Sequence, residues 1–517
     1  MKKIFAIVLS VLSMTVAAQE RIMVLSDPHV LPQSLLDTSS LAFHEMMDSQ
    51  RKMIDMSEPA FIALVDTALA YHPDLVLIPG DLTKDSEKAS HALVVAQLNR
   101  LQQAGIPTLL IPGNHDIGGN AYAYLGDQKT PVENLSDAEW ETTYSMVYQH
   151  VIANDVQSHS YVAEPLNHVT VLGIDGAHDN AGTGSLSAQT LQWILAQADS
   201  ARTKGNMMIA MSHWQILEHI DQQGTLESSC RFKEADAIRD SLMHHGVHLI
   251  LTGHFHVNGI TTYHGQQQTD SLVEITTGSP ITFPCPYRWL TLSEDRHAIG
   301  VQTEFISSLD TVDNMYVYSR EWMREHATNM IPQMTILAWK KEENHMDMLD
   351  LLMDEDTKAE LLGCIPESDS AKIDLVQRHM GSTIVDLYLL HSEANEPEHP
   401  EADSLAQALY TGMENMFDEI TANTSPYFRF FAVPLLKNFG LGMAEGPVQS
   451  LVEDVTQRNT YADRTDDLNG LFFINDGYQA IETVSSEATP HKFIRNGQLI
   501  IERGKTKYNV LGQQVNE

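Results

Sequence analysis

Five short apolar segments in this sequence each run into a polar residue of a type that binds metal ions. The segments span 22–25, 75–78, 108–111, 207–211 and 248–251. A sixth apolar segment, 169–174, has the same character. Short runs of this kind are typical of strands that are buried on both faces. Because sites in open α/β sheets assemble beyond the carboxyl ends of the strands, the residues that follow these segments are expected to lie close together.

The residues after these segments supply only oxygen and imidazole donors. They are Asp27, His29, Asp81, Asn114, His213, His254 and His256. A donor set without thiolate suits Mn²⁺, Fe, Zn²⁺ or Mg²⁺. Seven donors exceed what one tetrahedral ion needs, so the set predicts two divalent ions that share a ligand. A single histidine among the 24 in the chain is more often a packing residue, but the ordered set argues against chance.

The segment LILTGHFHVNG, at 249–259, holds two of these histidines. His254 and His256 are two residues apart, so in an extended segment both rings would leave the same face. Gly253 removes a side chain where the backbone must turn or approach another group. Phe255 is expected to point into the core.

Helical patterns separate the apolar segments. Asp85 or Ser86 is expected to cap one helix, and Ser187 is expected to cap another. The alternation of strands and helices over residues 19–305 predicts an α/β (α+β) domain.

Different patterns follow this domain. Residues 310–475 favour a mainly helical domain, interrupted by an acidic, proline-containing loop at 391–403. Residues 491–517 predict a small β-module, because Asn496-Gly497 between apolar runs is a strong hairpin signal.

The first residues, 1–18, have the pattern of a secretory signal peptide that is cut after Ala18. They combine two lysines, an apolar run that is short for a membrane span, and small residues before the expected cut. No later apolar stretch is long enough to cross a membrane. We therefore expect an exported chain that is periplasmic, on the cell surface or secreted.

Charge and cysteine content narrow the class of protein. Lysine and arginine number 32 against 69 aspartate and glutamate, a formal net charge of −37, which disfavours a nucleic-acid polymer as partner. A small phosphate ester stays compatible, because bound metal reverses the field locally. The three cysteines, Cys230, Cys285 and Cys364, allow at most one disulfide, and free thiols are the simpler expectation.

The ordered motifs DPH, GD, GNHD, SH and GHFH resemble those of the calcineurin-like metallophosphoesterase family over about residues 20–300. The stretch GSLSAQTLQWI, at 184–194, is similar to a feature of the cyclic-nucleotide phosphodiesterase-like branch, with the spacing loosened by one residue. The resemblance implies a double β-sheet sandwich flanked by helices, here followed by the mainly helical domain and the short β tail.

The resemblance also implies a two-metal centre at the strand ends. One ion would be held by Asp27, His29 and His256, and the other by Asn114, His213 and His254, with Asp81 as the bridge. A metal-bridging hydroxide would attack the phosphorus, while His115 assists the leaving group. Two roles stay open for Asp116, which either orients the ring of His115 or caps the next turn.

The implied function is an exported phosphoesterase, with a phosphodiesterase favoured over a phosphomonoesterase. Small phosphodiesters and phospholipid head groups are the expected substrates. A non-catalytic surface protein that keeps the fold is the alternative from another class. The segment 31–60 is interpreted either as a lid or rim over the site or as an extra surface helix. The tail resembles the C-terminal modules of proteins exported by the type IX route, which implies secretion machinery as a partner; a plain β-appendage is the alternative.

Overall fold

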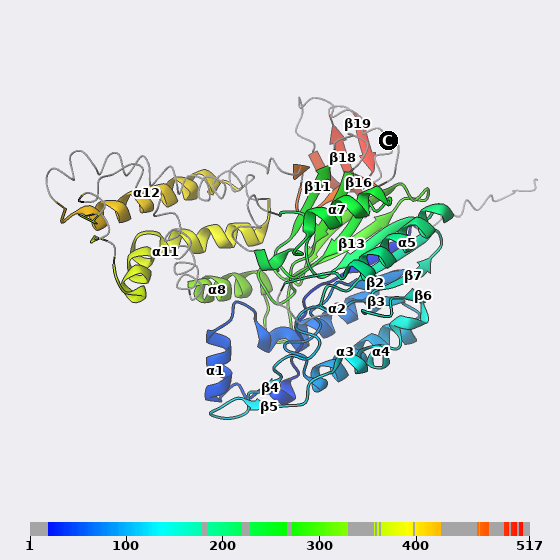
Figure 1. The fold of residues 1–517 in the computed structure, drawn as a ribbon, viewed down its shortest axis with the longest axis horizontal. Coiled ribbons are helices and arrows are strands. Elements are labelled where there is room, and N and C mark those ends of the chain that lie inside the picture. The colour runs from blue at the N-terminus through cyan, green and yellow to red at the C-terminus, as the bar shows by residue number, and fades with distance from the viewer. Residues whose placement is uncertain are drawn as a thin grey trace, which may run out of the picture.

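The computed structural model describes most of the chain, and the predicted signal peptide, 1–18, lies outside the described residues. The described residues are 19–177, 183–219, 228–265, 271–328, 356, 359–360, 363–364, 366–395, 399–424, 463–464, 466–474, 491–495, 498–503 and 506–509. Two large sheets and their covering helices make up the first part of the chain (Figure 1).

The first sheet has six strands in the order β16-β14-β13-β1-β2-β3. Their bounds are Gly470–Phe473, Ala298–Phe305, Pro286–Leu292, Arg21–Val24, Leu75–Ile78 and Thr108–Leu110. The strands β1, β2 and β3 are parallel neighbours, whereas β13 pairs antiparallel with β1.

The second sheet has eight strands in the order β15-β11-β12-β10-β9-β8-β7-β6. Their bounds are Asp463–Arg464, Gly259–His264, Ser271–Thr276, Leu249–Thr252, Met207–Ser212, Val169–Ile174, Tyr161–Leu166 and Val151–Asn154. The four central strands, β12, β10, β9 and β8, run parallel to one another.

Side chains of the second sheet alternate between two cores. Val171, Ile209 and Leu251 face the first sheet, where they share one buried cluster with Ile22 and Leu77. Their neighbours Leu172, Ala210 and Ile250 belong to a second cluster, which also holds residues of two covering helices. This period of two is what a strand imposes when both of its faces are buried. The predicted double sandwich is confirmed.

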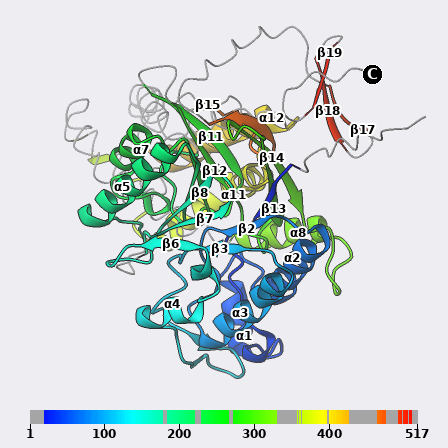
Figure 2. The same ribbon diagram turned by 90° about the vertical axis from the view of Figure 1, so that its right-hand side faces the viewer.

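Helices cover both outer faces of this sandwich (Figure 2). The helices α5, Ala188–Lys204, and α7, Ala235–His244, pack on the second sheet. The helices α2, Ser57–Tyr71, and α3, Lys88–Gln103, pack on the first. Shorter elements beside them are α1, α4, β4 and β5, which span Leu41–Asp48, Trp140–Thr143, Tyr122–Ala123 and Thr130–Pro131.

One of the two predicted caps is confirmed. Ser187 accepts a hydrogen bond from the backbone N–H of Thr190 at 3.0 Å and so begins α5. The helix α3 instead has Glu87 at its N-cap, directly after the two expected candidates Asp85 and Ser86. Asp85 does not cap this helix, because its carboxylate binds His115 and Lys84.

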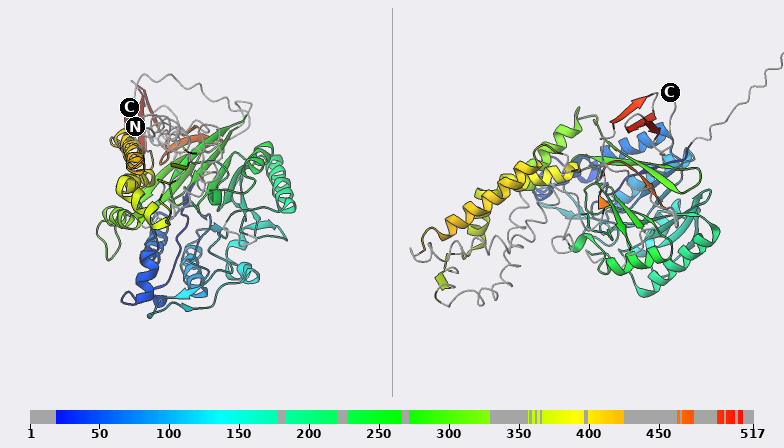
Figure 3. Two further views of the ribbon diagram at one scale, coloured as in Figure 1. Left: turned by 60° about the vertical axis from the view of Figure 1, so that its left-hand side comes forward. Right: turned by 90° about the horizontal axis from the view of Figure 1, so that it is seen from above.

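Among the described residues, three helices follow the sandwich and extend away from it (Figures 1 and 3). They are α8, Met315–Ala327, α11, Asp369–Glu393, and α12, Ala402–Thr421. Met323, Val376, Met380 and Leu409 join them in one buried cluster. The helical character of this region agrees with the prediction. Within the described residues no helix is both long and apolar enough to cross a membrane.

After these helices, residues 463–464 and 470–473 add strands to the two sheets. The helical pattern of 310–475 did not predict these strands. The strand β15 pairs with β11, and β16 pairs with β14. The fully buried guanidinium of Arg288 holds the residues between these strands, since it donates to the carbonyls of Asp467, at 2.9 Å, and Leu468, at 3.3 Å. The end of the predicted helical domain is therefore a structural part of the sandwich.

The tail forms a separate three-stranded antiparallel sheet. Its strands are β17, His491–Arg495, β18, Gln498–Arg503, and β19, Thr506–Asn509. The pairing of β17 with β18 ends at Arg495 and Gln498, and the predicted Asn496-Gly497 turn between them lies outside the described residues. All three cysteines of the chain are free thiols.

Candidate metal centre

The seven predicted ligands all follow the carboxyl ends of five strands. Asp27 and His29 follow β1, Asp81 follows β2 and Asn114 follows β3, in the first sheet. In the second sheet His213 follows β9, while His254 and His256 follow β10. Since the strands that carry these residues run parallel within each sheet, their carboxyl ends meet at one edge of the sandwich.

These side chains form two groups whose donor atoms lie within 4.8 Å of one another. The first group contains Asp27, His29, Asp81 and His256. The Nε2 atoms of His29 and His256 are 3.0 Å apart, and Asp27 Oδ1 lies 3.3 Å from His256 Nε2. Asp81 Oδ2 approaches His29 Nε2 at 3.5 Å.

The second group contains Asp81, His213 and His254. His213 Nε2 lies 3.3 Å from Asp81 Oδ2 and 3.0 Å from His254 Nδ1. Asn114 Oδ1 adds an amide oxygen at 3.1 Å from the same His213 nitrogen. Asp81 therefore belongs to both groups, and all seven predicted residues lie together.

The backbone of five of the seven residues is left-handed. The φ angles are 54° for Asp27, 41° for His29, 49° for Asp81, 65° for His254 and 61° for His256. Residues other than glycine rarely adopt such angles, which cost on the order of 1–3 kcal/mol each. Strain of this kind gathers at functional sites, because the packed surroundings hold it there.

Two glycines allow the motifs to approach one another. A Cβ atom on Gly113 would lie 2.2 Å from Asp81 Oδ1, and one on Gly253 would lie 2.3 Å from Asp27 Oδ2. Both contacts are far inside van der Waals distance. Gly113 thus leaves room for the carboxylate that follows the neighbouring strand β2, and Gly253 leaves room for the carboxylate that follows β1 in the other sheet.

Burial and mutual charge set the protonation of the centre. Burial raises the pKa of Asp81, but His213, His115 and His29 outweigh it and hold that pKa well below its usual range. Burial lowers the pKa of His254 to about 3 and that of His256 to about 4. Neutral imidazoles and ionised carboxylates are the forms that bind metal.

His213 differs from the other histidines. Burial lowers its pKa, but the charge and hydrogen bond of Asp81 raise it to about 9. Cation binding at the second group therefore has to displace a proton from His213. With nitrogen and oxygen donors converging and no thiolate among them, the seven residues fit two divalent cations.

His115 stands beside the centre without belonging to either group. Its backbone N–H donates to Asp81 Oδ1 at 2.9 Å, and its ring centroid lies 4.9 Å from that of His29. The Nδ1 atom of the ring lies 2.8 Å from Asp85 Oδ1. The sequence analysis did not predict that Asp85 would bind the ring of His115, although an acidic residue four positions after Asp81 could have indicated it.

Asp116 does not contact the ring of His115. Its carboxylate accepts from the backbone N–H groups of Gly113 at 2.8 Å, Thr83 at 2.9 Å and Leu82 at 3.1 Å. These bonds fasten the loop after β3 to the loop after β2. Asp116 therefore does not orient the ring of His115, which was one of its two expected roles. It organises the turns that carry Asp81 and Asn114 instead.

The segment 31–60 contains α1 and also reaches the centre. Lys52 Nζ lies 3.5 Å from His29 Nε2, so this segment is a rim of the site as well as the location of a surface helix. Burial lowers the pKa of Lys52 to about 8, which leaves the ammonium charged at neutral pH. The sequence offered no signal for Lys52, because its contact depends on how a long connection folds back.

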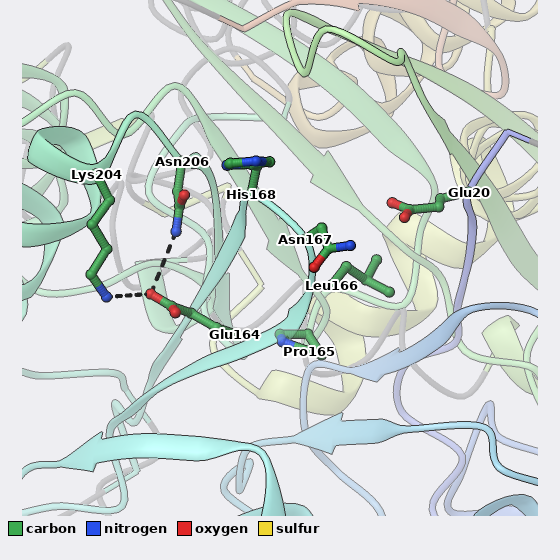
Figure 4. Close-up of a pocket in the computed structure, with 8 residues that line it drawn as sticks. All are labelled: Glu20, Glu164, Pro165, Leu166, Asn167, His168, Lys204 and Asn206. Atoms are coloured by element: carbon green, nitrogen blue, oxygen red, sulfur yellow. Dashed lines mark hydrogen bonds and ion pairs between the residues drawn. The ribbon is translucent and has the colours of Figure 1, made fainter. Parts of the chain in front are cut away.

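A separate pocket lies away from these ligands. It has a volume of about 570 Å³ and is open to one side, where Lys204 pairs with Glu164 (Figure 4). The lining residues are Glu20, Glu164, Pro165, Leu166, Asn167, His168, Lys204 and Asn206. They lie at the starts of β1, β8 and β9 and at the end of β7, whereas the ligands follow the carboxyl ends of β1 and β9. The pocket thus belongs to the opposite edge of the sheets.

Comparison with known proteins finds a family model that matches the first part of the chain. Residues 20–258 match the family model described as calcineurin-like phosphoesterase. Over 75 residues the chain is 36% identical to the DNA double-strand break repair protein Mre11 of Saccharolobus solfataricus. That match spans 14% of this chain and about a fifth (19%) of the relative's length.

Two solved structures are similar at low sequence identity. A dimetal phosphatase from Danio rerio is 13% identical with a TM-score of 0.39, and the match covers 55% of this chain and 95% of that one. A purple acid phosphatase from yellow lupin (Lupinus luteus) seeds is 12% identical with a TM-score of 0.35, over 55% and 51% of the two chains.

Proposed function

The part of the chain that spans residues 20–258 belongs to the calcineurin-like phosphoesterase family, and from this premise we propose that the protein is a two-metal phosphoesterase that prefers phosphodiesters. The family and the buried cluster of ligand residues support a dimetal phosphoesterase. The preference for diesters over monoesters is a further part of the proposal, argued below.

One observation carries the proposal, namely that Asp81 belongs to both groups of donor atoms. Asp81 Oδ2 lies 3.5 Å from His29 Nε2 and 3.3 Å from His213 Nε2, so this carboxylate faces both groups and can serve two cations. Asp27, His29 and His256 would hold one cation, and Asn114, His213 and His254 the other. When bound, such a pair of ions activates water near neutral pH and neutralises charge on a phosphoryl group.

His115 is the proposed proton donor to the leaving oxygen. Asp85 accepts a hydrogen bond from Nδ1, so Nε2 of the same ring is left to give its proton. The side chain of His115 is 29% exposed, which leaves it open to a substrate.

The preference for diesters rests on the resemblance of the stretch 184–194 to the cyclic-nucleotide phosphodiesterase-like branch, and this stretch lies close to the proposed ligands. A Cβ atom on Gly184 would lie 2.6 Å from the indole of Trp214, which directly follows the ligand residue His213. The ring of Trp214 also lies 5.5 Å from that of His254. This stretch therefore packs behind two of the proposed ligands and shapes the wall of the centre on that side.

The location and substrates are further parts of the proposal. The pattern of residues 1–18 supports export, with a periplasmic, cell-surface or secreted destination. Small phosphodiesters and phospholipid head groups are the proposed substrates. The three-stranded sheet formed by β17, β18 and β19 supports a sorting module that is read by secretion machinery.

The test compares a chromogenic phosphodiester with its monoester, first with Mn²⁺ and then with a chelator. Faster hydrolysis of the diester that the chelator abolishes is the expected result. Faster hydrolysis of the monoester would make the protein a phosphomonoesterase. Bound metal without turnover of either ester would contradict the proposal and favour a non-catalytic binding protein. Asp81→Asn is the matched variant, expected to lose both metal and turnover.

A further inference from the structure

Lys52 is a cation that the structure holds against the metal centre without an acidic partner. Its Nζ lies 3.5 Å from His29 Nε2, and its side chain is only partly buried. Over the described residues Lys52 makes no ion pair with a carboxylate, whereas Lys84 pairs with Asp85 and Lys204 with Glu164. The chain has a net charge of −37 and many carboxylates, so the position of a lysine beside the metal centre without a carboxylate partner has to be explained.

The backbone on both sides of Lys52 is fixed. Arg51 donates a hydrogen bond to the hydroxyl of Tyr388, and its guanidinium lies 5.7 Å from the centre of that ring. Met53 is fully buried, and its N–H donates to the carbonyl of Ile281 at 2.9 Å. Because both neighbouring residues are anchored, the ammonium of Lys52 can occupy only a limited region. This region adjoins the donor atoms of the first group.

Charges of both signs surround Lys52. Asp81 and Asp85 lie near enough to attract it, and Lys84 and Arg51 near enough to repel it. Asp81 is committed to the proposed cations, and Asp85 to His115 and Lys84. Among the described residues no carboxylate is therefore left to neutralise Lys52, and a bound anion would supply the missing charge.

We propose that Lys52 anchors the substrate by binding a non-bridging oxygen of its phosphoryl group. The inference rests on the proposed function and adds a specificity-determining residue to it. An ammonium is a compact donor that can meet one oxyanion oxygen while other groups hold the rest of the phosphate. Free inorganic phosphate offers the same oxygens and binds Lys52 in the same way.

The helix α11 sets the position of this anchor. Tyr388 holds Arg51 from one turn of α11, and His391, one turn later, places its ring 5.6 Å from that of Phe255. Phe255 separates the proposed ligands His254 and His256. One helix outside the sandwich thus contacts both the rim that carries Lys52 and the turn that carries two histidines, which gives the helical region a role in substrate binding.

The experiment uses the full chain loaded with Mn²⁺ and three substitutions, Lys52→Met, Lys52→Arg and the control Lys204→Met. Metal content is measured by mass spectrometry, and binding of inorganic phosphate by calorimetry. We expect Lys52→Met to keep its metal while the Kd for phosphate rises about 10- to 100-fold, the loss expected for one charge-assisted hydrogen bond. KM for the diester should rise with it, Lys52→Arg should recover part of the loss, and Lys204→Met should match the parent.

Two results would overturn the inference. One is a Lys52→Met chain with full metal content and the phosphate affinity of the parent. The other is a Lys52→Met chain with altered metal content, since Lys52 would then act on the cations. If the parent hydrolyses neither ester, the proposed function fails instead, and phosphate calorimetry still decides the role of Lys52.

A second variant tests the contribution of α11. Tyr388→Phe removes the hydroxyl that accepts from Arg51 and leaves the ring in place. We expect a rise in the Kd for phosphate of about threefold to tenfold, as for one neutral acceptor, with unchanged metal content. A Kd equal to that of the parent would show that α11 does not position Lys52.

Discussion

His115 and Asp85 face one another across 2.8 Å, although 30 residues separate them in the chain. Burial raises the pKa of Asp85, but the hydrogen bond from His115 and the charge of Lys84 outweigh it and hold that pKa at about 2. The carboxylate is therefore ionised throughout the neutral range. An ionised acceptor at Nδ1 fixes which ring nitrogen of His115 carries the hydrogen bond and which faces outward.

Replacing Asp85 by asparagine tests this arrangement. We expect Asp85→Asn to lower kcat for the diester by about 10- to 100-fold, because the ring loses its orienting charge. KM and metal content should stay near those of the parent, and the pH profile of kcat should shift. Steady-state kinetics between pH 5 and 9, with metal analysis, measure these effects.

A matched control comes from a similar contact outside the site. His159 Nε2 lies 2.9 Å from Asp137 Oδ1 at the protein surface. Asp137→Asn removes the same kind of carboxylate and should leave kcat unchanged. If both variants behave alike, Asp85 has no positioning role.

The proposed ligands could be predicted because each one follows an apolar strand directly. Buried strands can be recognised from local hydrophobicity, and parallel strands bring their carboxyl ends to one edge of a sheet. Asp27, Asp81 and His213 could therefore be predicted as ligands without knowledge of distant contacts. The cap at Ser187 was likewise a local signal. Each of these rests on a few neighbouring residues.

Contacts between distant segments could not be predicted in this way. The left-handed backbone of His254 and His256 turns the two rings toward different groups, whereas an extended segment would have kept them on one face. Lys52 lies near His29 because the next residue, Met53, is buried and bonded to Ile281, which is more than 200 positions away in the sequence. Asp85 binds His115 across neighbouring loops and so fails to cap α3 as expected.

The close approach of Gly113 to Asp81 gives a prediction about metal binding. In Gly113→Ala the new Cβ would lie 2.2 Å from Asp81 Oδ1, so the carboxylate or the loop has to move. We expect most of the bound metal to be lost and turnover to fall by about 100-fold or more, because misplacing a reacting group by 1 Å has that effect. Metal analysis and diester hydrolysis measure both.

Gly126→Ala is the control for this substitution. A Cβ atom there meets nothing within 4 Å, so the variant should keep its metal and its turnover. Full metal occupancy in Gly113→Ala would show that the loop after β3 adapts, and that the glycine is not needed for room beside Asp81.

Arg288 gives a prediction about stability. Its guanidinium also donates to Thr303 Oγ1 at 2.8 Å and to the carbonyl of Thr276 at 2.9 Å, all within the buried sandwich. Arg288→Met leaves several buried acceptors unpaired, so we expect the free energy of unfolding to fall by about 3 kcal/mol or more. Hydrogen exchange should speed up most in 466–474, the segment that Arg288 fastens.

The control is Arg100→Met, which removes a partly exposed guanidinium paired with Asp66. Denaturant unfolding of that variant should stay close to the parent, since exposed ion pairs contribute little. Unchanged hydrogen exchange over 466–474 in Arg288→Met would mean that strand pairing alone holds the returning segment.

Glu274 gives a prediction about the dependence of stability on pH. Its carboxylate is fully buried and accepts from the N–H groups of Ile216 at 3.1 Å and Leu217 at 2.6 Å. Burial outweighs these bonds and raises its pKa from 4.5 to about 7. Between these two values the folded chain holds a proton that the unfolded chain has released, so the contribution of Glu274 to stability is greatest below pH 4.5 and is lost as the pH rises through 7.

Glu274→Gln removes this titration while its amide oxygen keeps an acceptor for the same backbone groups. The free energy of unfolding of the variant should therefore rise relative to the parent between about pH 4.5 and 7, by up to about 3 kcal/mol, and level off above pH 8. Denaturant unfolding at a series of pH values measures the difference, with the exposed Glu141→Gln as control. Parallel curves for parent and Glu274→Gln would show that the buried carboxylate does not retain its proton, because the N–H groups of the loop after β9 then stabilise its ionised form fully.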